Sequence, residues 1–208
     1  MALELVVIVG SYLLGSVSFS VLLAKMLKGI DIRQHGSGNA GATNTLRVLG
    51  KGPAILVLAL DVLKGIAAVW LGIWAGGWGT WIPALCGLAA IIGHNWPVYF
   101  HFRGGKGIAT TIGVMATLCF WPALYAGIIA ILSIIVTRYV SLGSLIFVAL
   151  TPIFLLFTDY SLPMLWSSLI IAVFAYWRHR GNIVKLIQGR ENKLGSKDKS
   201  EGGKRVVR

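Results

Sequence analysis

The chain has 208 residues, of which 56% are hydrophobic and only 12% are charged, and its mean hydropathy is +0.78. A soluble globular domain carries about 25% charged residues, so these values exclude that class and indicate an integral membrane protein. The formal net charge of +12 is concentrated between the apolar segments and near the C-terminus. Its position therefore bears on the topology.

The apolar residues occur in blocks that approach the roughly 20 residues needed to cross about 30 Å of hydrocarbon. The block at 107–137 is too long for one untilted span, and we divide it at Trp121-Pro122 into two short spans. The predicted spans are residues 4–24, 53–75, 80–100, the two halves of 107–137, 139–158 and 162–177. The expected fold class is an all-α integral membrane protein with seven transmembrane helices.

With seven spans, all the basic loop residues fall on one side of the membrane. They are Lys25, Lys28, Arg33, Arg47, Lys51, Arg103, Lys106, Arg138 and the basic residues from Arg178 onward. Short basic loops stay in the cytoplasm, so we expect the N-terminus outside, the C-terminus inside and short glycine-rich motif loops on the cytoplasmic face. Six spans would place Arg138 and the basic tail outside. We assign residues 1–188 to a single seven-span membrane catalytic domain and 189–208 to a basic cytoplasmic tail, expected to be disordered.

Two glycine-rich segments between apolar blocks carry the residues typical of phosphate binding. Glycines let backbone N–H groups face an anion, while Ser, Thr and Asn add donors and Arg and Lys add charge. The first segment offers Gly36, Ser37, Gly38, Asn39, Gly41, Thr43, Asn44 and Arg47, and the second offers Gly104, Gly105, Lys106 and Gly107. The alternatives are a flexible connector for the first and a basic turn for the second. The second lacks the spacing of a nucleotide-binding P-loop.

Other polar residues near the same face are further candidates. His94 is either functional or a helix-end residue bonded to a carbonyl, while His179 and Asn182 lie in a basic segment that favours function. Ser141 is either a helix cap or a substrate donor. Asp61 and Lys64 lie three residues apart on one helix face and form either a structural ion pair or part of the site. The two cysteines are expected to be small buried apolar residues.

Missing patterns narrow the chemistry. The sequence has no cluster of carboxylates to hold Mg²⁺, and we expect no metal and no cofactor. It has no histidine followed five residues later by aspartate, and no G-x-S-x-G nucleophile segment. If the reaction is acyl transfer, the donor therefore needs a good leaving group, as a mixed anhydride has.

Four segments together resemble the bacterial PlsY family of acyl-phosphate:glycerol-3-phosphate acyltransferases over nearly the whole chain. They are GSGNAGATNTLR at 36–47, DVLKG at 61–65, GHNWPV at 93–98 leading into FRGGKG at 102–107, and RHRGNI at 178–183. The resemblance implies seven spans, an active site on the cytoplasmic side of the bacterial plasma membrane, and transfer of a fatty acyl group from acyl phosphate to the 1-hydroxyl of sn-glycerol 3-phosphate. The products are lysophosphatidic acid and inorganic phosphate, in the first membrane step of phospholipid synthesis.

Roles for individual residues follow from the same resemblance. Ser37, Gly38, Asn39 and Arg47 match the motif used in catalysis and acyl-phosphate contact, residues 104–107 match the glycerol-phosphate site, and His179 and Asn182 match a third, catalytic motif. The expected partners are the two substrates, membrane lipids and the soluble enzyme that makes acyl phosphate, with no nucleic acid. Arg103 and Arg180-Gly181 depart from the family's usual residues, which weakens any role for those side chains.

Two questions stay open at this stage. A substrate phosphate oxygen, His94 or His179 is the candidate proton acceptor. The rival functions are a phosphate or phospholipid transporter or flippase, and a noncatalytic membrane scaffold. Transporters usually show repeated halves and sites near the middle of the membrane, whereas here the polar groups gather on one face and no repeat is visible.

Overall fold

The computed structural model describes residues 1–195, and this part of the chain is helical without a β-strand. Its long helices are α1 (Ala2–Gly15), α2 (Phe19–Lys28), α4 (Lys51–Gly76), α5 (Trp81–Asn95), α6 (Ile108–Leu118), α7 (Phe120–Thr137), α8 (Val140–Leu155) and α9 (Leu162–Arg178). Shorter elements are η1 (Ile32–Gln34), α3 (Ala42–Leu49), η2 (Val98–Phe100) and α10 (Arg180–Ile187). The predicted all-α class is therefore confirmed for the described residues.

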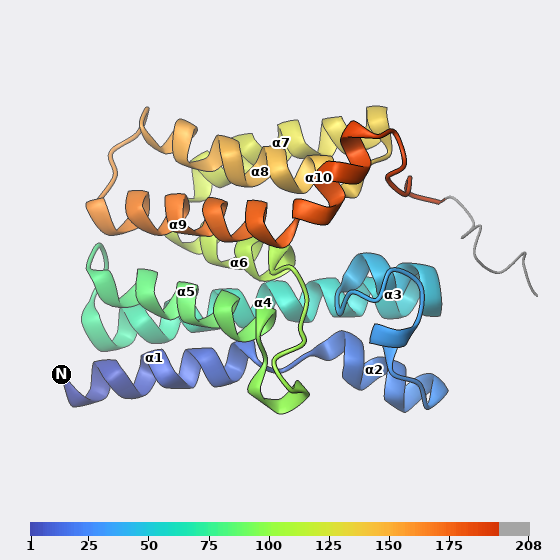
Figure 1. Cartoon of the computed structure of the whole chain (residues 1–208). Helices are drawn as coiled ribbons and strands as arrows, with labels where there is room; N and C mark the ends of the chain where they lie inside the picture. The colour runs from blue at the N-terminus through green and yellow to red at the C-terminus, as the bar shows by residue number, and fades with distance from the viewer. Residues whose placement is uncertain (196–208) are drawn as a thin grey trace, which may run out of the picture.

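The helices lie side by side in one bundle (Figure 1). The N-terminus, the α4–α5 turn and the α8–α9 connection lie at one end, while α3 and α10 lie toward the other. The principal core contains Val69, Ile91, Val114, Met115 and Phe147, from the four helices α4, α5, α6 and α8. A smaller core under α2 and η1 contains Val21, Ala24, Ile32 and Ala40. The polar motifs are therefore carried at one end of an apolar framework.

The predicted first span, residues 4–24, is interrupted. The helix stops after Gly15 and restarts at Phe19, and Ser16 and Ser18 in the interruption are both buried. Serine side chains compete with the backbone for hydrogen bonds, which favours such a break. Irregular backbone at membrane depth needs partners within the protein. Here the Val17 carbonyl accepts a hydrogen bond from Lys64 Nζ at 2.8 Å.

The block at 107–137 does form two helices, but the break lies at Cys119 and not at Trp121-Pro122. Pro122 instead occupies the first turn of α7, where proline is tolerated because its missing N–H would have no partner in the helix. Both cysteines, Cys86 and Cys119, are free and buried, as predicted.

Glycines bring the central helices close together. A Cβ at Gly15 would overlap the Ala90 carbonyl of α5, and one at Gly113 of α6 would overlap the Val62 carbonyl of α4. Helices in lipid associate through close backbone packing, which small residues permit. These positions therefore require glycine because the backbones of neighbouring helices lie too close for a side chain, and not because of an unusual φ.

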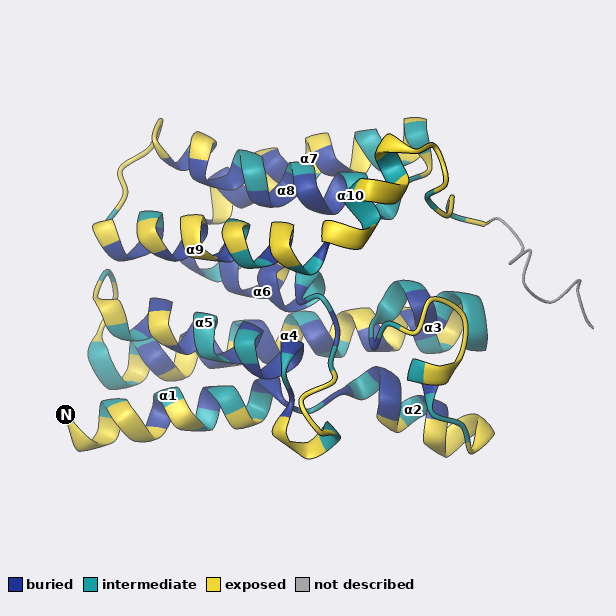
Figure 2. Cartoon of the chain, in the orientation of Figure 1, coloured by how far each residue is buried: buried dark blue, intermediate teal, exposed yellow. Residues whose placement is uncertain are grey.

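The outer faces of the bundle expose apolar side chains, including Leu5 and Val6 on α1 and Ile135 and Val136 on α7. Figure 2 shows exposed residues along α1 and α9. Segments 2–28, 51–76 and 120–137 are long and apolar enough to cross a membrane, and 108–118, 140–155 and 162–178 are shorter apolar helices. An apolar exterior of this extent suits lipid and not water. The chain is a multi-pass membrane protein.

The first residues assigned to the tail fold back onto the bundle. The Leu194 N–H donates to the Arg138 carbonyl at 2.7 Å, and the Arg138 guanidinium donates to the Leu194 carbonyl. Residues 189–195 therefore pack against the helices, whereas the sequence predicts that they belong to a disordered tail. The remainder of that segment, 196–208, lies outside the described residues.

Candidate active site

The first glycine-rich motif folds around the buried side chain of Asn44. Its amide nitrogen donates to the carbonyls of Ile32 (3.1 Å) and His35 (3.0 Å), and its oxygen accepts from the Ser37 N–H (2.8 Å). Gly36 lies at φ +58° and would overlap the Asn44 oxygen if it carried a Cβ. Asn44, predicted as a substrate contact, therefore holds the loop in shape.

The remaining predicted residues of this motif lie around the start of α3. Ser37 is exposed and, within the described residues, its hydroxyl makes no hydrogen bond to protein. Asn39 is half-buried beside Gly41, which caps α3, and Thr43 and Arg47 lie on that helix. The N–H groups of Ser37 and Gly38 are already bonded within the loop, so the hydroxyl of Ser37 is the donor left at these two positions.

The second motif is pressed against the C-terminal end of α5. The N–H groups of Gly104 and Gly105 donate to the carbonyls of Asn95 (3.2 Å) and His94 (3.1 Å). A Cβ at Gly105 would overlap His94 Nε2 and the Ala40 carbonyl of the first motif. These two glycines therefore allow close packing, and their N–H groups are not directed at an anion as the sequence suggested.

Arg178, at the end of α9, fastens the same segment from the other side. Its guanidinium donates to the carbonyls of Gly105 (2.6 Å) and Gly104 (3.3 Å) and lies 5.4 Å from the centre of the Trp96 ring. Arginine suits this position because it can bond and stack at once. The second motif is thus held between α5 and α9.

Lys106 is the point at which the second and third motifs meet. Its ammonium donates to the side-chain oxygen of Asn182, whose amide nitrogen donates to Glu191 at 2.7 Å. Ser141 donates to the same carboxylate oxygen at 3.0 Å. The structure therefore brings together the candidates Lys106, Asn182 and Ser141, and it adds Glu191, which the sequence places in the expected tail.

Burial, and after it the neighbouring charges, shift the pKa of Lys106. Burial lowers the pKa of Lys106 to about 8; the Glu191 carboxylate raises it, while Arg178, Arg47 and Lys185 lower it. Three cations and one carboxylate therefore act on one half-buried ammonium group. Such an excess of positive charge favours an anionic ligand.

His179 lies beside this cluster between α9 and α10. Its Nδ1 lies 2.8 Å from the Ala175 carbonyl, and because a carbonyl only accepts, Nδ1 carries the hydrogen. Burial lowers the pKa of His179 to about 4, with further lowering by Lys106 and Arg178 and an opposing contribution from the Ala175 hydrogen bond. The ring is thus neutral near pH 7, with Nε2 as its acceptor nitrogen.

His94 belongs to a different, fully buried group. Lys64 Nζ lies 2.7 Å from Asp61 Oδ1 and 3.0 Å from His94 Nδ1, and it also holds the Val17 carbonyl of the α1–α2 break. The other ring nitrogen of His94 lies against Gly105. These contacts support the structural alternative for Asp61, Lys64 and His94, which together connect the break to the second motif.

Asn95 is a further residue that the sequence analysis did not select. It is buried, neither atom of its side-chain amide has a partner among the described residues, and its oxygen faces Gly107. Gly107 itself has φ +85° and caps α6. The signal in the sequence that points to Asn95 is the polar pair His94-Asn95 at the end of an apolar helix. Within residues 1–195, no group of three or more His, Cys, Asp or Glu side chains could hold a metal ion.

Comparisons with known proteins identify the family to which the chain is similar. The profile of the glycerol-3-phosphate acyltransferase family matches residues 5–189. A glycerol-3-phosphate acyltransferase from Shouchella clausii is 62% identical over 191 residues, which cover 89% of this chain and 93% of the relative. Another of that name from Halalkalibacterium halodurans is 56% identical over 202 residues, covering 95% and 98%.

The fold is similar to two crystal structures of PlsY, described as an integral membrane glycerol 3-phosphate acyltransferase. The glycerol 3-phosphate form has a TM-score of 0.88 at 38% identity and covers 92% of this chain and 96% of that one. The lysophosphatidic acid form has a TM-score of 0.86 at 38% identity and covers 92% and 95%. From its motifs, its fold and these relatives, the chain belongs to the glycerol-3-phosphate acyltransferase family.

Proposed function

We propose that the chain transfers a fatty acyl group from acyl phosphate to the 1-hydroxyl of sn-glycerol 3-phosphate, giving lysophosphatidic acid and inorganic phosphate. The observation that carries this proposal is the cationic cluster at the meeting of the three motifs, where Arg47, Arg178 and Lys185 all act on Lys106. Both substrates carry phosphate, and such a cluster can hold their charges close together. The glycerol 3-phosphate and lysophosphatidic acid forms of PlsY support the same acceptor and product.

In this proposal the phosphate of glycerol 3-phosphate binds Lys106, and the phosphate of the donor lies between the first motif and Arg47. The 1-hydroxyl oxygen attacks the acyl carbonyl, so that a carbon–oxygen ester bond forms as the bond to phosphate breaks. Side chains of Ser37 and Asn39 donate to the developing oxyanion, an effect worth about 3–4 kcal/mol for a well-placed donor. The departing phosphate takes both electrons of the broken bond.

The hydroxyl proton passes to a phosphate oxygen of the substrate. Buried contacts on both ring nitrogens make His94 a poor base in this arrangement. The Nε2 of His179 has no hydrogen-bond partner among residues 1–195, and we give His179 and Asn182 the role of ordering Lys106 and its bound phosphate. We expect His94→Ala and His179→Ala to retain measurable turnover, whereas Lys106→Ala loses it. Loss of turnover in His179→Ala with unchanged glycerol 3-phosphate binding would reassign the base to His179.

The membrane arrangement is part of the proposal. Seven spans with the N-terminus outside would place the motif loops, α3 and α10 in the cytoplasm of a bacterial cell, where glycerol 3-phosphate is dissolved. A soluble enzyme that makes acyl phosphate would then supply the donor at the same face. The basic loop residues support this orientation.

Purified protein in detergent tests the activity directly. With acyl phosphate and glycerol 3-phosphate, we expect equal amounts of lysophosphatidic acid and inorganic phosphate, and no acylation when a thioester replaces the acyl phosphate. Lys106→Met provides the inactive control, and Lys25→Met is the matched control at an exposed position in the last turn of α2. Absence of phosphate release would contradict the proposal, and transfer from the thioester would contradict the donor.

A further inference from the structure

A tight turn leads into the second motif. Its central residues His101 and Phe102 have φ of +57° and +58°, and the Arg103 N–H donates to the Phe100 carbonyl at 3.3 Å. Turns with two positive φ angles favour glycine and asparagine, because other side chains crowd the backbone there. A His-Phe pair in this conformation therefore needs support from outside the turn.

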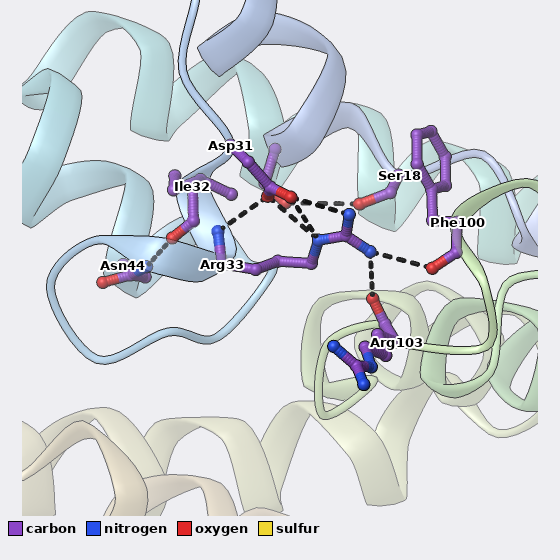
Figure 3. A network of polar contacts seen from close by, with 8 residues as sticks. Ser18, Asp31, Ile32, Arg33, Asn44, Phe100 and Arg103 are labelled. Atoms are coloured by element: carbon purple, nitrogen blue, oxygen red, sulfur yellow. Dashed lines mark hydrogen bonds and ion pairs between the residues drawn. The ribbon is translucent and has the colours of Figure 1, made fainter.

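Arg33 supplies that support from the loop before the first motif (Figure 3). One nitrogen of its guanidinium donates to the Phe100 carbonyl at 2.8 Å and to the Arg103 carbonyl at 3.3 Å. It thus bonds both ends of the strained turn. The next residues along the chain are Gly104, Gly105 and Lys106.

Asp31 fixes the orientation of Arg33. The Arg33 Nε lies 2.9 Å from one carboxylate oxygen, and the second terminal nitrogen lies 2.7 Å from the other. The Arg33 N–H also donates to this carboxylate at 3.0 Å. The side-chain hydrogen bond from Arg33 lowers the pKa of Asp31. Two nitrogens of the guanidinium, Nε and one terminal nitrogen, therefore bond Asp31, and the other terminal nitrogen bonds the turn.

The space around this contact is open. A cavity of about 220 Å³ lies between the two loops and is lined by Asp31, Arg33, Gln34, Gly38, Arg103 and Gly104. The Phe100 side chain packs against the small core that includes Ile32 and Ala40, which anchors the start of the turn. At the Arg103 end, however, the loops face each other across the cavity, and the Arg33 side chain bridges them.

We propose that Arg33, oriented by Asp31, is a positioning residue that holds the turn 100–103 and thereby sets the position of Lys106. The inference rests on the proposed function in that Lys106 binds the phosphate of the acyl acceptor. Arg33 acts only through the turn. Its removal should therefore affect the acceptor and leave the donor unaffected.

The decisive variant is Arg33→Lys, which keeps the charge but replaces three nitrogens by one, so that it cannot keep both the two-point contact with Asp31 and the bonds to the turn. We expect the KM for glycerol 3-phosphate to rise about tenfold, while the KM for acyl phosphate stays within about twofold. The thermal midpoint in detergent should change by less than about 2 °C. Asp31→Asn should give a smaller rise, and adding it to Arg33→Lys should cause little further change, since Asp31 acts through Arg33. Gln34→Ala, which alters the same cavity, is the matched control.

A second measurement does not need turnover. Hydrogen–deuterium exchange of peptides covering 98–107 should be faster in Arg33→Lys than in the wild type and unchanged in Gln34→Ala. Unchanged exchange and unchanged KM would overturn the inference, as would an equal rise in both KM values with a lower thermal midpoint. If the wild type transferred no acyl group, the proposed function would fail, and the exchange result would still decide whether Arg33 holds the turn.

Discussion

The position and the charge of Lys106 depend on several neighbouring residues. Asn182 receives its hydrogen bond, Glu191 offsets the surrounding positive charge, and Arg178 holds the carbonyls of the two residues preceding Lys106. The ammonium group is thus placed and tuned by elements far apart in the chain. Its protonation state then decides how strongly a phosphate is attracted.

This tuning predicts an alkaline loss of acceptor use. Because the pKa of Lys106 is lowered to about 8, the group is charged below that pH and loses its charge above it. We expect kcat/KM for glycerol 3-phosphate to fall as pH rises from about 7 to about 10. The pH dependence of this ratio reports the pKa values of essential groups in the free enzyme, and Lys106 is the group that loses its charge in this range. Lys106→Arg should remove the fall, since a guanidinium stays charged. The same alkaline fall in both proteins would contradict the assignment.

The sequence predicted the chemistry of the residues at the site, but it could not predict which of them bind substrate and which hold the loops in shape. Glycine, asparagine and lysine in the motifs predicted phosphate chemistry, and Lys106 and Asn182 do lie together. Asn44 has the same composition-based signal as Asn39, but only the fold shows that its amide is used within the loop. Likewise the N–H groups of Gly104 and Gly105 are occupied by α5 carbonyls, a contact that spacing along the chain cannot reveal.

At the scale of elements, the break between α1 and α2 depends on a residue from α4. Lys64 holds the free Val17 carbonyl while neutralising Asp61 and contacting His94. Hydropathy predicted one continuous span here because Ser16-Val17-Ser18 does not interrupt the apolar block. The break was missed for that reason, and so was α3, whose eight residues lie in a segment expected to be a loop.

Lys64→Met should therefore destabilise the protein strongly. It leaves a buried carboxylate without its cation, which typically costs about 3–5 kcal/mol, and it frees the Val17 carbonyl. Lys51→Met, at the exposed start of the same helix, should have little effect. The thermal midpoint in detergent measures both. Equal midpoints for the two variants would contradict a role for Lys64 in holding the break.

The contact between α4 and α6 makes a second prediction at this scale. In Gly113→Ala the new methyl group would overlap the Val62 carbonyl, which is backbone and cannot turn away, whereas Gly127 has nothing within 4 Å. We expect Gly113→Ala to lower stability by about 1–3 kcal/mol. Gly127→Ala on α7 should be neutral or stabilising, because alanine favours helix. Urea or thermal unfolding of the pair gives the comparison, and a neutral Gly113→Ala would show that the helices can separate without cost.

On the scale of the whole molecule, the connections between helices fall into two groups, one at each end of the bundle. The α4–α5 and α8–α9 connections lie at the end of the bundle that also holds the N-terminus (Figure 1). They contain no Lys or Arg, whereas the connections that carry the motifs are basic. Charge and hydropathy anticipated this division because both depend on local composition. They could not place residues 189–195, whose docking depends on Arg138 and Glu191 meeting distant partners.

Cysteine labelling tests the proposed orientation. Cys86 and Cys119 are buried, so we expect them to react little with a maleimide, and labelling then reports on a cysteine introduced at an exposed site. In intact cells a membrane-impermeant maleimide should label Asp159→Cys at the α8–α9 connection. Lys25→Cys near the end of α2 should react only after the membrane is permeabilised. The reverse pattern would place the motif loops outside.

The contacts of Glu191 also bear on the order in which the protein is made. Glu191 follows α9 and α10 in the chain, yet it accepts hydrogen bonds from Ser141 and Asn182 beside Lys106. During synthesis every spanning helix therefore leaves the ribosome before the carboxylate that completes this cluster. A nascent chain that still lacks Glu191 would have the cations without their counter-charge, so the site is finished only after α10 and the residues that follow it have been made.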